Sequence, residues 1–171
     1  GKMHSYFISY KTTIENIENA LNHINTNERY FNDNGLPSLQ DEAHTKHILN
    51  QINDSIWSLK IYEEEKLVKE MDLKYYFPSF IHGSHKEYYD NGVLKKDYNY
   101  KNGVLNGKAI DFKENSTPLI EGVYKNGKID GIINYYWAKN GKLKQKFEAK
   151  EGILLNVQEL YDINGNAFEI G

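Results

Sequence analysis

The N-terminal third of the chain carries a hydrophobic pattern with helical spacing. From Thr12, the stretch TTIENIENALNHI places apolar residues three, four and three positions apart, on one side of a helix. The stretch FNDNGLPS then ends this pattern with turn-forming residues. A second, less regular helix is predicted from about Ser38 through DEAHTKHILNQI. Residues 1–54 are therefore predicted to be helical, burying Ile14, Ile17, Leu21 and Ile24 in the first helix and Leu39, Ala43, Ile48 and Ile52 in the second.

Beyond Gly83 the pattern changes to short apolar and aromatic segments separated by turns. Asn-Gly pairs recur, and they favour tight hairpins because both residues tolerate the positive φ of a type I′ turn. The segments between them are rich in Tyr, Ile, Val and Phe, which is typical of strands. This half of the chain is therefore predicted to form antiparallel β-hairpins. The Asn-Gly pairs stand at 91–92, 102–103, 106–107, 126–127, 140–141 and 164–165.

The hairpins are expected to repeat. Units that begin at Gly83, Gly107, Gly131 and Asn156 are 24, 24 and 25 residues apart, and each complete unit contains two turns. Hairpins repeated head to tail form a meander in which each contacts mainly its neighbours. We therefore predict an α+β protein, in which N-terminal helices precede an elongated antiparallel β-meander. The predicted units are a degenerate copy at 55–82, repeats at 83–106, 107–130 and 131–155, and a partial repeat at 156–171.

Aromatic residues follow the same period. Tyr88, Phe112, Tyr136 and Tyr161 each lie five residues after a unit start. Our main interpretation is that they form rungs that stiffen the sheet; the alternative is a ligand-facing role. A single-layer sheet would also leave an open surface, and Tyr is enriched in interfaces. The residues predicted to bind a partner are Tyr98, Tyr100, Tyr124, Trp137 and Phe147.

Composition narrows the classes of function. The chain has 171 residues, of which 39% are hydrophobic and 26% charged, as is ordinary for a folded globular protein. No apolar run reaches the roughly 18–20 residues that a membrane span needs. A net charge of -3 argues against binding nucleic acid through its phosphates. The absence of cysteine excludes disulfides, thiolate nucleophiles and Cys-ligated zinc. Gly1 stands where an initiator Met is expected, so we expect either a removed signal peptide or an arbitrary truncation.

Candidate chemistry is sparse. His44 and His47 could share a metal on the second predicted helix, and His82 and His85 precede the first clear repeat. No carboxylate follows at the spacing of a known metal motif, so exposed histidines are the favoured interpretation. The acidic run at 63–65 is expected in a solvated turn. We predict no catalytic residue, no cofactor and no metal. Lysines at the turns could contact anionic lipids or simply keep the turns soluble: Lys101, Lys125, Lys128, Lys139 and Lys142.

About half of the chain resembles a known repeat. The stretches are GSHKEYYDNGVL from Gly83, YKNGVLNG at 100–107, YKNGKIDG at 124–131 and GIINYYWAKNGKL at 131–143. They resemble the MORN-variant repeat (membrane occupation and recognition nexus) of the bacterial YwqK-like antitoxin family. The resemblance implies a hairpin array that serves as a scaffold, a protein-binding surface or a membrane-proximal module.

The function that follows is non-enzymatic. The resemblance implies a protein-interaction module of a bacterium, either antitoxin-like or a secreted or surface binding protein. Its expected partner is a toxin or an envelope or surface protein, and we expect no nucleic acid. We expect an exported protein, extracellular or periplasmic, or a cytoplasmic one if it is a true antitoxin. The alternative is a phospholipid-binding module at a membrane surface, named by homology after phosphatidylinositol-4-phosphate 5-kinase but lacking the kinase domain.

Overall fold

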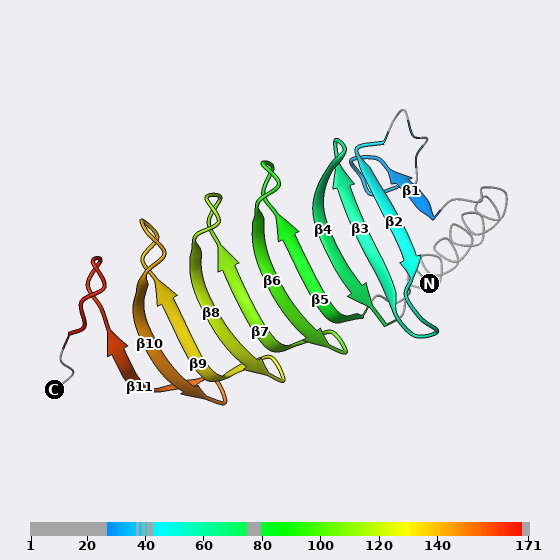
Figure 1. Ribbon diagram of the computed structural model, residues 1–171. Coiled ribbons are helices and arrows are strands. Elements are labelled where there is room, and N and C mark those ends of the chain that lie inside the picture. The colour runs from blue at the N-terminus through cyan, green and yellow to red at the C-terminus, as the bar shows by residue number, and fades with distance from the viewer. Residues whose placement is uncertain (1–26, 37, 39, 41–42, 75–79, 169–171) are drawn as a thin grey trace, which may run out of the picture.

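The fold is a single antiparallel sheet in which each described strand pairs with its immediate neighbours in the chain. A computed structural model describes residues 27–36, 38, 40, 43–74 and 80–168. Eleven strands follow one another in sequence order across one sheet, as Figure 1 shows. The strands are β1 (Glu28–Phe31), β2 (Thr45–Gln51), β3 (Trp57–Glu63), β4 (Lys66–Leu73), β5 (Ile81–Tyr88), β6 (Leu94–Lys101), β7 (Val104–Phe112), β8 (Pro118–Lys125), β9 (Lys128–Tyr136), β10 (Leu143–Lys150) and β11 (Ile153–Leu160).

The prediction of an α+β fold with N-terminal helices is wrong for the described residues, which contain no α-helix. The second predicted helix is strand β2, which pairs along its full length with β3. In TKHILNQ, the side chains of His47 and Leu49 lie on one face of the sheet and those of Lys46 and Ile48 lie on the other. The segment therefore forms a strand with a period of two residues, and its irregular helical spacing does not produce a helix. The first predicted helix, over Ile14–Ile24, lies outside the described residues.

Two-residue turns follow β3, β6, β8 and β10. Of the six predicted Asn-Gly pairs, 102–103 and 126–127 form such turns, whereas 91–92, 140–141 and 164–165 lie in longer loops and 106–107 lies inside β7. At the β6–β7 turn, Asn102 has φ 51° and Gly103 has φ 79°, the positive values that a type I′ turn requires at both central residues. The glycine N–H also donates a hydrogen bond to the carbonyl of the preceding hairpin. The distances are 2.9 Å for Gly103 to Ile81, 2.8 Å for Gly127 to Leu105 and 2.8 Å for Gly152 to Ile129. Each turn is thus tied to the hairpin before it.

A periodic bulge lies near these turns. Tyr98 pairs with Ala109 and Tyr100 pairs with Leu105, so three residues of β7 face one residue of β6. At the centre of the three, Gly107 has φ 112°, and a Cβ there would lie 3.1 Å from the Cβ of Asn99. Glycine is required here on both counts. The same bulge recurs with Gly83 (φ 110°) and Gly131 (φ 141°), so each full repeat begins at a bulge glycine.

The fourth unit lacks this glycine and is built differently. Asn156 begins that unit, and the β10–β11 ladder shifts register by one residue at two separate places. The bulge of the other units is thereby divided into two smaller irregularities. This difference links the glycine directly to the form of the bulge.

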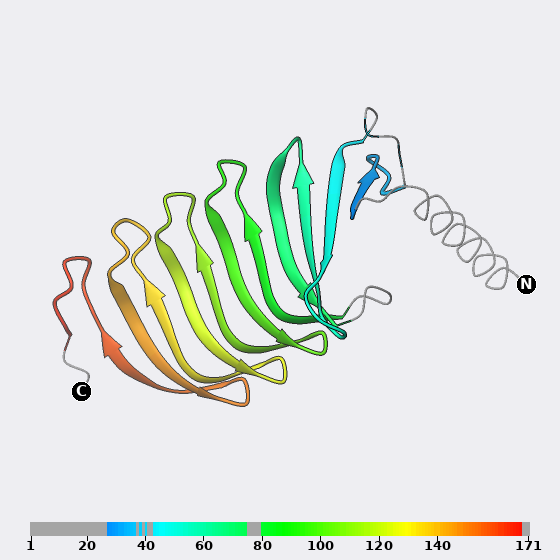
Figure 2. The same cartoon turned by 45° about the vertical axis from the view of Figure 1, so that its right-hand side comes forward.

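The strands bend at the end where the bulges lie. Figure 2 shows the strands curving towards the end of the sheet that carries the two-residue turns after β6, β8 and β10, so that the sheet forms a trough. Directly paired residues share a face of a sheet, and the five buried side chains prove to lie on one face: Leu59, Leu73, Ala109, Ile133 and Ala149. Side chains on the inner side of a bend crowd together, so we infer that the sheet curves towards this face.

The two faces differ in chemistry. One central row crosses ten strands on the face just described, which we call the aromatic face: Leu49, Leu59, Met71, His85, Tyr98, Ala109, Gly122, Ile133, Phe147 and Val157. The adjacent row lies on the opposite side, which we call the charged face: Ile48, Lys60, Glu70, Lys86, Asp97, Ile110, Glu121, Asn134, Lys146 and Glu159. Among the described residues, no element packs against either face.

Candidate binding surface

Ion pairs and tyrosine hydroxyls stabilise the charged face. The Lys86 Nζ lies 3.3 Å from Glu70 Oε1, and the Lys146 Nζ lies 2.8 Å from Glu159 Oε1. Three of the predicted aromatic rungs bond to carboxylates of the same row: Tyr88 to Glu70 at 2.6 Å, Tyr136 to Glu121 at 3.1 Å and Tyr161 to Glu159 at 2.8 Å. These side chains satisfy one another within the fold. The charged face is therefore the less suitable of the two for capturing a partner.

Tyr98 anchors the centre of the aromatic face. It lies between His85 of β5 and Ala109 of β7, and its hydroxyl donates to Asp111 Oδ1 at 2.7 Å. Burial raises the pKa of Tyr98, and the bond to Asp111 raises it further, so the phenol stays protonated. The hydroxyl is thereby committed to the fold, while the partly exposed ring remains on the surface.

Tyr100 and Tyr124 lie in the next row of the same face, towards the bend. Alternation along β6 and β8 places them beside Tyr98 and Gly122. The ring of Tyr100 lies 5.7 Å from that of His85. Tyr124 and Ile129 close over Gly122: a Cβ at Gly122 would lie 3.0 Å from Ile129 Cδ1 and 3.5 Å from Tyr124 Cε2. A small residue at 122 therefore lets two larger side chains meet above it.

Phe147 extends the aromatic face to β10. It pairs with Ile133, and its ring meets the Tyr135 ring edge to face, with centroids 5.7 Å apart. Tyr135 was not among the predicted binding residues. The alternation of β9 could have identified it, because Ile133 and Tyr135 are two residues apart in one strand.

Trp137 does not join the other predicted residues. Strand β9 ends at Tyr136, and Trp137 begins the loop that follows. Its Nε1 donates to the Tyr161 carbonyl at 3.2 Å, and the Lys144 Nζ lies 4.7 Å from the centre of the ring. The structure thus brings Tyr98, Tyr100, Tyr124 and Phe147 together on one face and uses Trp137 to connect neighbouring loops.

Polar residues flank the centre of the aromatic face. A second row on the aromatic face, two residues along each strand from the central row, has charged side chains at four successive positions on β4 to β7: Lys69, Glu87, Lys96 and Asp111. The Lys96 Nζ lies 3.3 Å from Glu87 Oε2. The charges of the four side chains alternate in sign, so this stretch carries no excess of either sign. It limits the apolar area and would give a bound partner polar contacts.

His85 is the residue that departs from the repeat. Ala109 and Ile133 occupy the same row and the same place in their units, and both are buried. The Nδ1 of His85 is buried without a hydrogen-bond partner among the described residues. Burial lowers its pKa, although Glu87, 3.7 Å away, favours the charged ring.

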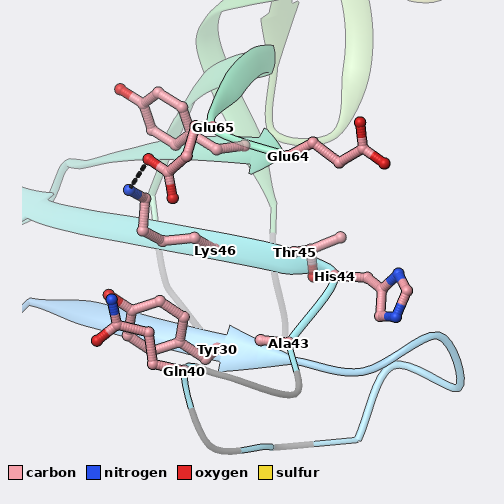
Figure 3. A pocket seen from close by; sticks show the side chains of 9 residues that line it. Tyr30, Gln40, Ala43, His44, Thr45, Lys46, Glu64 and Glu65 are labelled. Carbon is pink, nitrogen blue, oxygen red and sulfur yellow. Dashed lines mark hydrogen bonds and ion pairs between the residues drawn. The ribbon is translucent and has the colours of Figure 1, made fainter.

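Two open hollows lie at the end of the sheet near β1 and β2. One of about 280 Å³ is lined by residues of β1, β2 and the β3–β4 turn. Figure 3 shows Lys46 reaching across it to Glu65, at 2.7 Å. Tyr30 lines the same hollow and donates to Glu28 at 2.7 Å. Each of these groups thus has a hydrogen-bond partner in the fold.

The other candidate groups remain apart. His44 pairs with Asp33 at 3.1 Å, while His82 contacts Asn102 at 3.0 Å. Within the described residues, no three His, Asp or Glu side chains are placed to hold a metal ion.

The acidic run forms the tight β3–β4 turn, because β3 ends at Glu63 and β4 begins at Lys66. The described part of the chain contains no helix that is long and apolar enough to cross a membrane.

Comparisons with known proteins give no assignment. No protein-family model matches this sequence, and no curated protein matches it. The likeness to the MORN-variant repeat therefore depends on the residues of those four stretches alone.

Proposed function

We propose that this protein is a non-enzymatic interaction module whose aromatic face binds a protein partner. The observation that carries the proposal is the continuity of this face: its central row crosses ten strands, and no described element covers it. Monomeric proteins rarely expose large apolar surfaces without a binding role. The resemblance to MORN-variant repeats agrees with this proposal and suggests a toxin or an envelope protein as the partner.

The trough form of the sheet suits a protein partner better than a small molecule. The aromatic rings are spread over several strands instead of surrounding one cavity, and small-molecule sites are usually enclosed. A membrane-surface role is the alternative. Of the lysines predicted to contact anionic lipids, Lys142 donates instead to the Asn164 carbonyl at 2.7 Å.

The test compares the two faces. We would use the whole chain to capture partners from fractions of the native organism, alongside a variant carrying Tyr100→Ala, Tyr124→Ala and Phe147→Ala. The triple variant should lose a partner that the wild type retains, because truncating central aromatic residues typically costs more than about 1 kcal/mol each in binding. Thermal unfolding would verify that the variant still folds.

The matched control alters the charged face, with Ile110→Ala, Phe112→Ala and Val123→Ala. This variant should retain the partner. Equal retention by both triple variants, or equal loss, would show that the aromatic face is not the binding surface. Flotation with anionic liposomes that weakens as salt is added would instead favour the membrane-surface alternative.

A further inference from the structure

Aromatic rings recur once per hairpin along the inside of the trough. Tyr100, Tyr124 and Phe147 lie on β6, β8 and β10, and all three side chains are partly exposed. The strands between them carry Ala109 and Ile133, which are only 7% and 2% exposed. Each ring is thus separated from the next by a strand whose central side chain is buried. Because neighbouring strands lie about 4.7–4.9 Å apart, the rings recur at intervals of about 9.4–9.8 Å.

This interval distinguishes between the conformations that a bound chain could adopt. The strands themselves are curved, so the trough runs across them and a linear segment would lie along the line of rings. A polyproline II helix has three residues per turn and rises about 3.1 Å per residue, so its pitch of about 9.3 Å fits the interval. An α-helix presents equivalent side chains about 10.5 Å apart over seven residues. An extended strand presents them about every 6.6–6.8 Å.

The differences add up along the trough. From β6 to β10 there are two intervals, and over them a polyproline II helix departs from the rings by at most about 1 Å. An α-helix departs by about 1.4–2.2 Å over the same distance. A strand is already about 3 Å out of step after one interval. The spacing of the rings therefore favours polyproline II.

The tyrosine hydroxyls of the trough also suit such a segment. On the charged face, the hydroxyls of Tyr88 and Tyr136 donate to carboxylates. Those of Tyr100 and Tyr124 make no hydrogen bond with any described residue, and neither oxygen is buried. A proline has a carbonyl but no N–H, and polyproline II has no internal hydrogen bonds, so a proline-rich chain requires donors from its binding site. Tyrosine hydroxyls supply them.

The charges beside the rings complement an uncharged partner. The flanking row of the aromatic face holds two lysines and two carboxylates in alternation: Lys69, Glu87, Lys96 and Asp111. A strongly acidic or basic segment would meet a like charge at every second position of this row. A proline-rich segment carries no side-chain charge and avoids that repulsion.

We propose that the partner of the aromatic face is a proline-rich segment in the polyproline II conformation, lying along the trough across β6 to β10 with one helical turn per hairpin. This inference rests on the proposed function and specifies the chemistry of its partner. Aromatic-lined grooves are a recurring binding site for such segments, which are preformed and so lose little conformational entropy on binding.

The first test titrates the whole chain with nonaproline, blocked at both ends, and measures binding by calorimetry or by NMR shifts. Nonaproline should bind at least about tenfold more tightly than triproline, because nine residues span three turns and reach three rings. Flexible Gly-Ser and helical alanine-rich peptides of matched length are the controls, and they should bind far more weakly. Absence of nonaproline binding, or equal binding of either control, would overturn the proposal.

The second test separates the ring from its hydroxyl. Tyr124→Phe keeps the ring and should weaken nonaproline binding about fivefold, the equivalent of one hydrogen bond. Tyr124→Ala should weaken it further. Tyr136→Phe is the matched control, because it removes a hydroxyl from the charged face, and it should bind nonaproline like the wild type. Unchanged binding by both Tyr124 variants, or equal weakening by Tyr136→Phe, would contradict the proposal. If Tyr124→Ala does not fold, Tyr124→Phe decides.

Failure here is distinct from failure of the proposed function. A wild type that ignores nonaproline, but captures a partner that the Tyr100→Ala, Tyr124→Ala and Phe147→Ala variant loses, would overturn the proline-rich partner and leave the aromatic face as the binding surface. A captured partner that this variant retains would overturn both.

Discussion

Glu64 and Glu65 carry positive φ values that their side chains do not favour. Their φ values are 47° and 63°, whereas the other type I′ turns place glycine second, as in Asn102–Gly103. A left-handed conformation costs a non-glycine residue on the order of 1–2 kcal/mol. The ion pair of Glu65 with Lys46 offsets little, because the Glu65 side chain is 77% exposed.

Replacing this turn by Asn-Gly should therefore stabilise the protein. We expect Glu64→Asn with Glu65→Gly to raise the free energy of unfolding by about 1 kcal/mol, measured by urea denaturation. The reciprocal change, Asn126→Glu with Gly127→Glu, should lower it by a similar or larger amount. If neither exchange changed the free energy of unfolding, φ strain would not decide the stability of these turns.

His85 makes the stability of the sheet dependent on pH. Burial lowers the pKa of His85 below its ordinary value of about 6.5, so the folded chain binds this proton more weakly than the unfolded chain does. Stability is therefore lost as pH falls through the unfolded value towards the lower folded value. The unpaired Nδ1 adds a cost that is independent of pH.

His85→Ile, the residue found at position 133, should remove both effects. We expect a gain in unfolding free energy of about 1 kcal/mol at pH 8 and a larger gain at pH 5. The comparison is made between variant and wild type at each pH, because His47 is partly buried and its lowered pKa contributes to both proteins alike. A gain that is the same at both pH values would contradict a titrating role for His85.

Among elements, the bulges are the parts most sensitive to a single change. Gly107→Ala combines a φ of 112° with a Cβ only 3.1 Å from the Cβ of Asn99, an atom fixed by the backbone of β6. We expect it to lower the unfolding free energy by about 2–3 kcal/mol, measured by chemical denaturation. Gly92→Ala is the control, because its φ is 79° but nothing lies within 4 Å of the added Cβ. It should cost about 1 kcal/mol; equal costs would mean that the bulge tolerates a side chain.

The same elements explain which predictions succeeded. Tight turns follow from local chemistry, so Asn102–Gly103 and Asn126–Gly127 could be placed from sequence. Strand β2 was mistaken for a helix because its strand character depends on pairing with β1 and β3, which short-range spacing does not show. The bulges were also missed: their glycines marked the period, but the number of residues facing each other depends on the partner strand.

At the scale of the whole molecule, the meander of hairpins could be predicted from the sequence. Which residues share a face of the sheet could be predicted only in part. Alternation is enough to place Tyr98 and Tyr100 on one side of β6. That Tyr98 meets Ala109, and Phe147 meets Ile133, depends on registers set by bulges and loops. Trp137 lies apart from the other four predicted residues, because β9 stops one residue before it. The aromatic face is thus a property of the assembled sheet.

The tie between each turn and the preceding hairpin has a consequence for how such chains change length. The Gly127 N–H reaches back to Leu105 and no farther, and strands make extensive contacts only with their immediate neighbours. A segment such as 107–130 is consequently self-sufficient: duplicating or deleting it in the gene would add or remove about 10 Å of sheet width, two strand spacings, without altering any other junction. The width of the sheet could therefore change during evolution by duplication or deletion of single repeats.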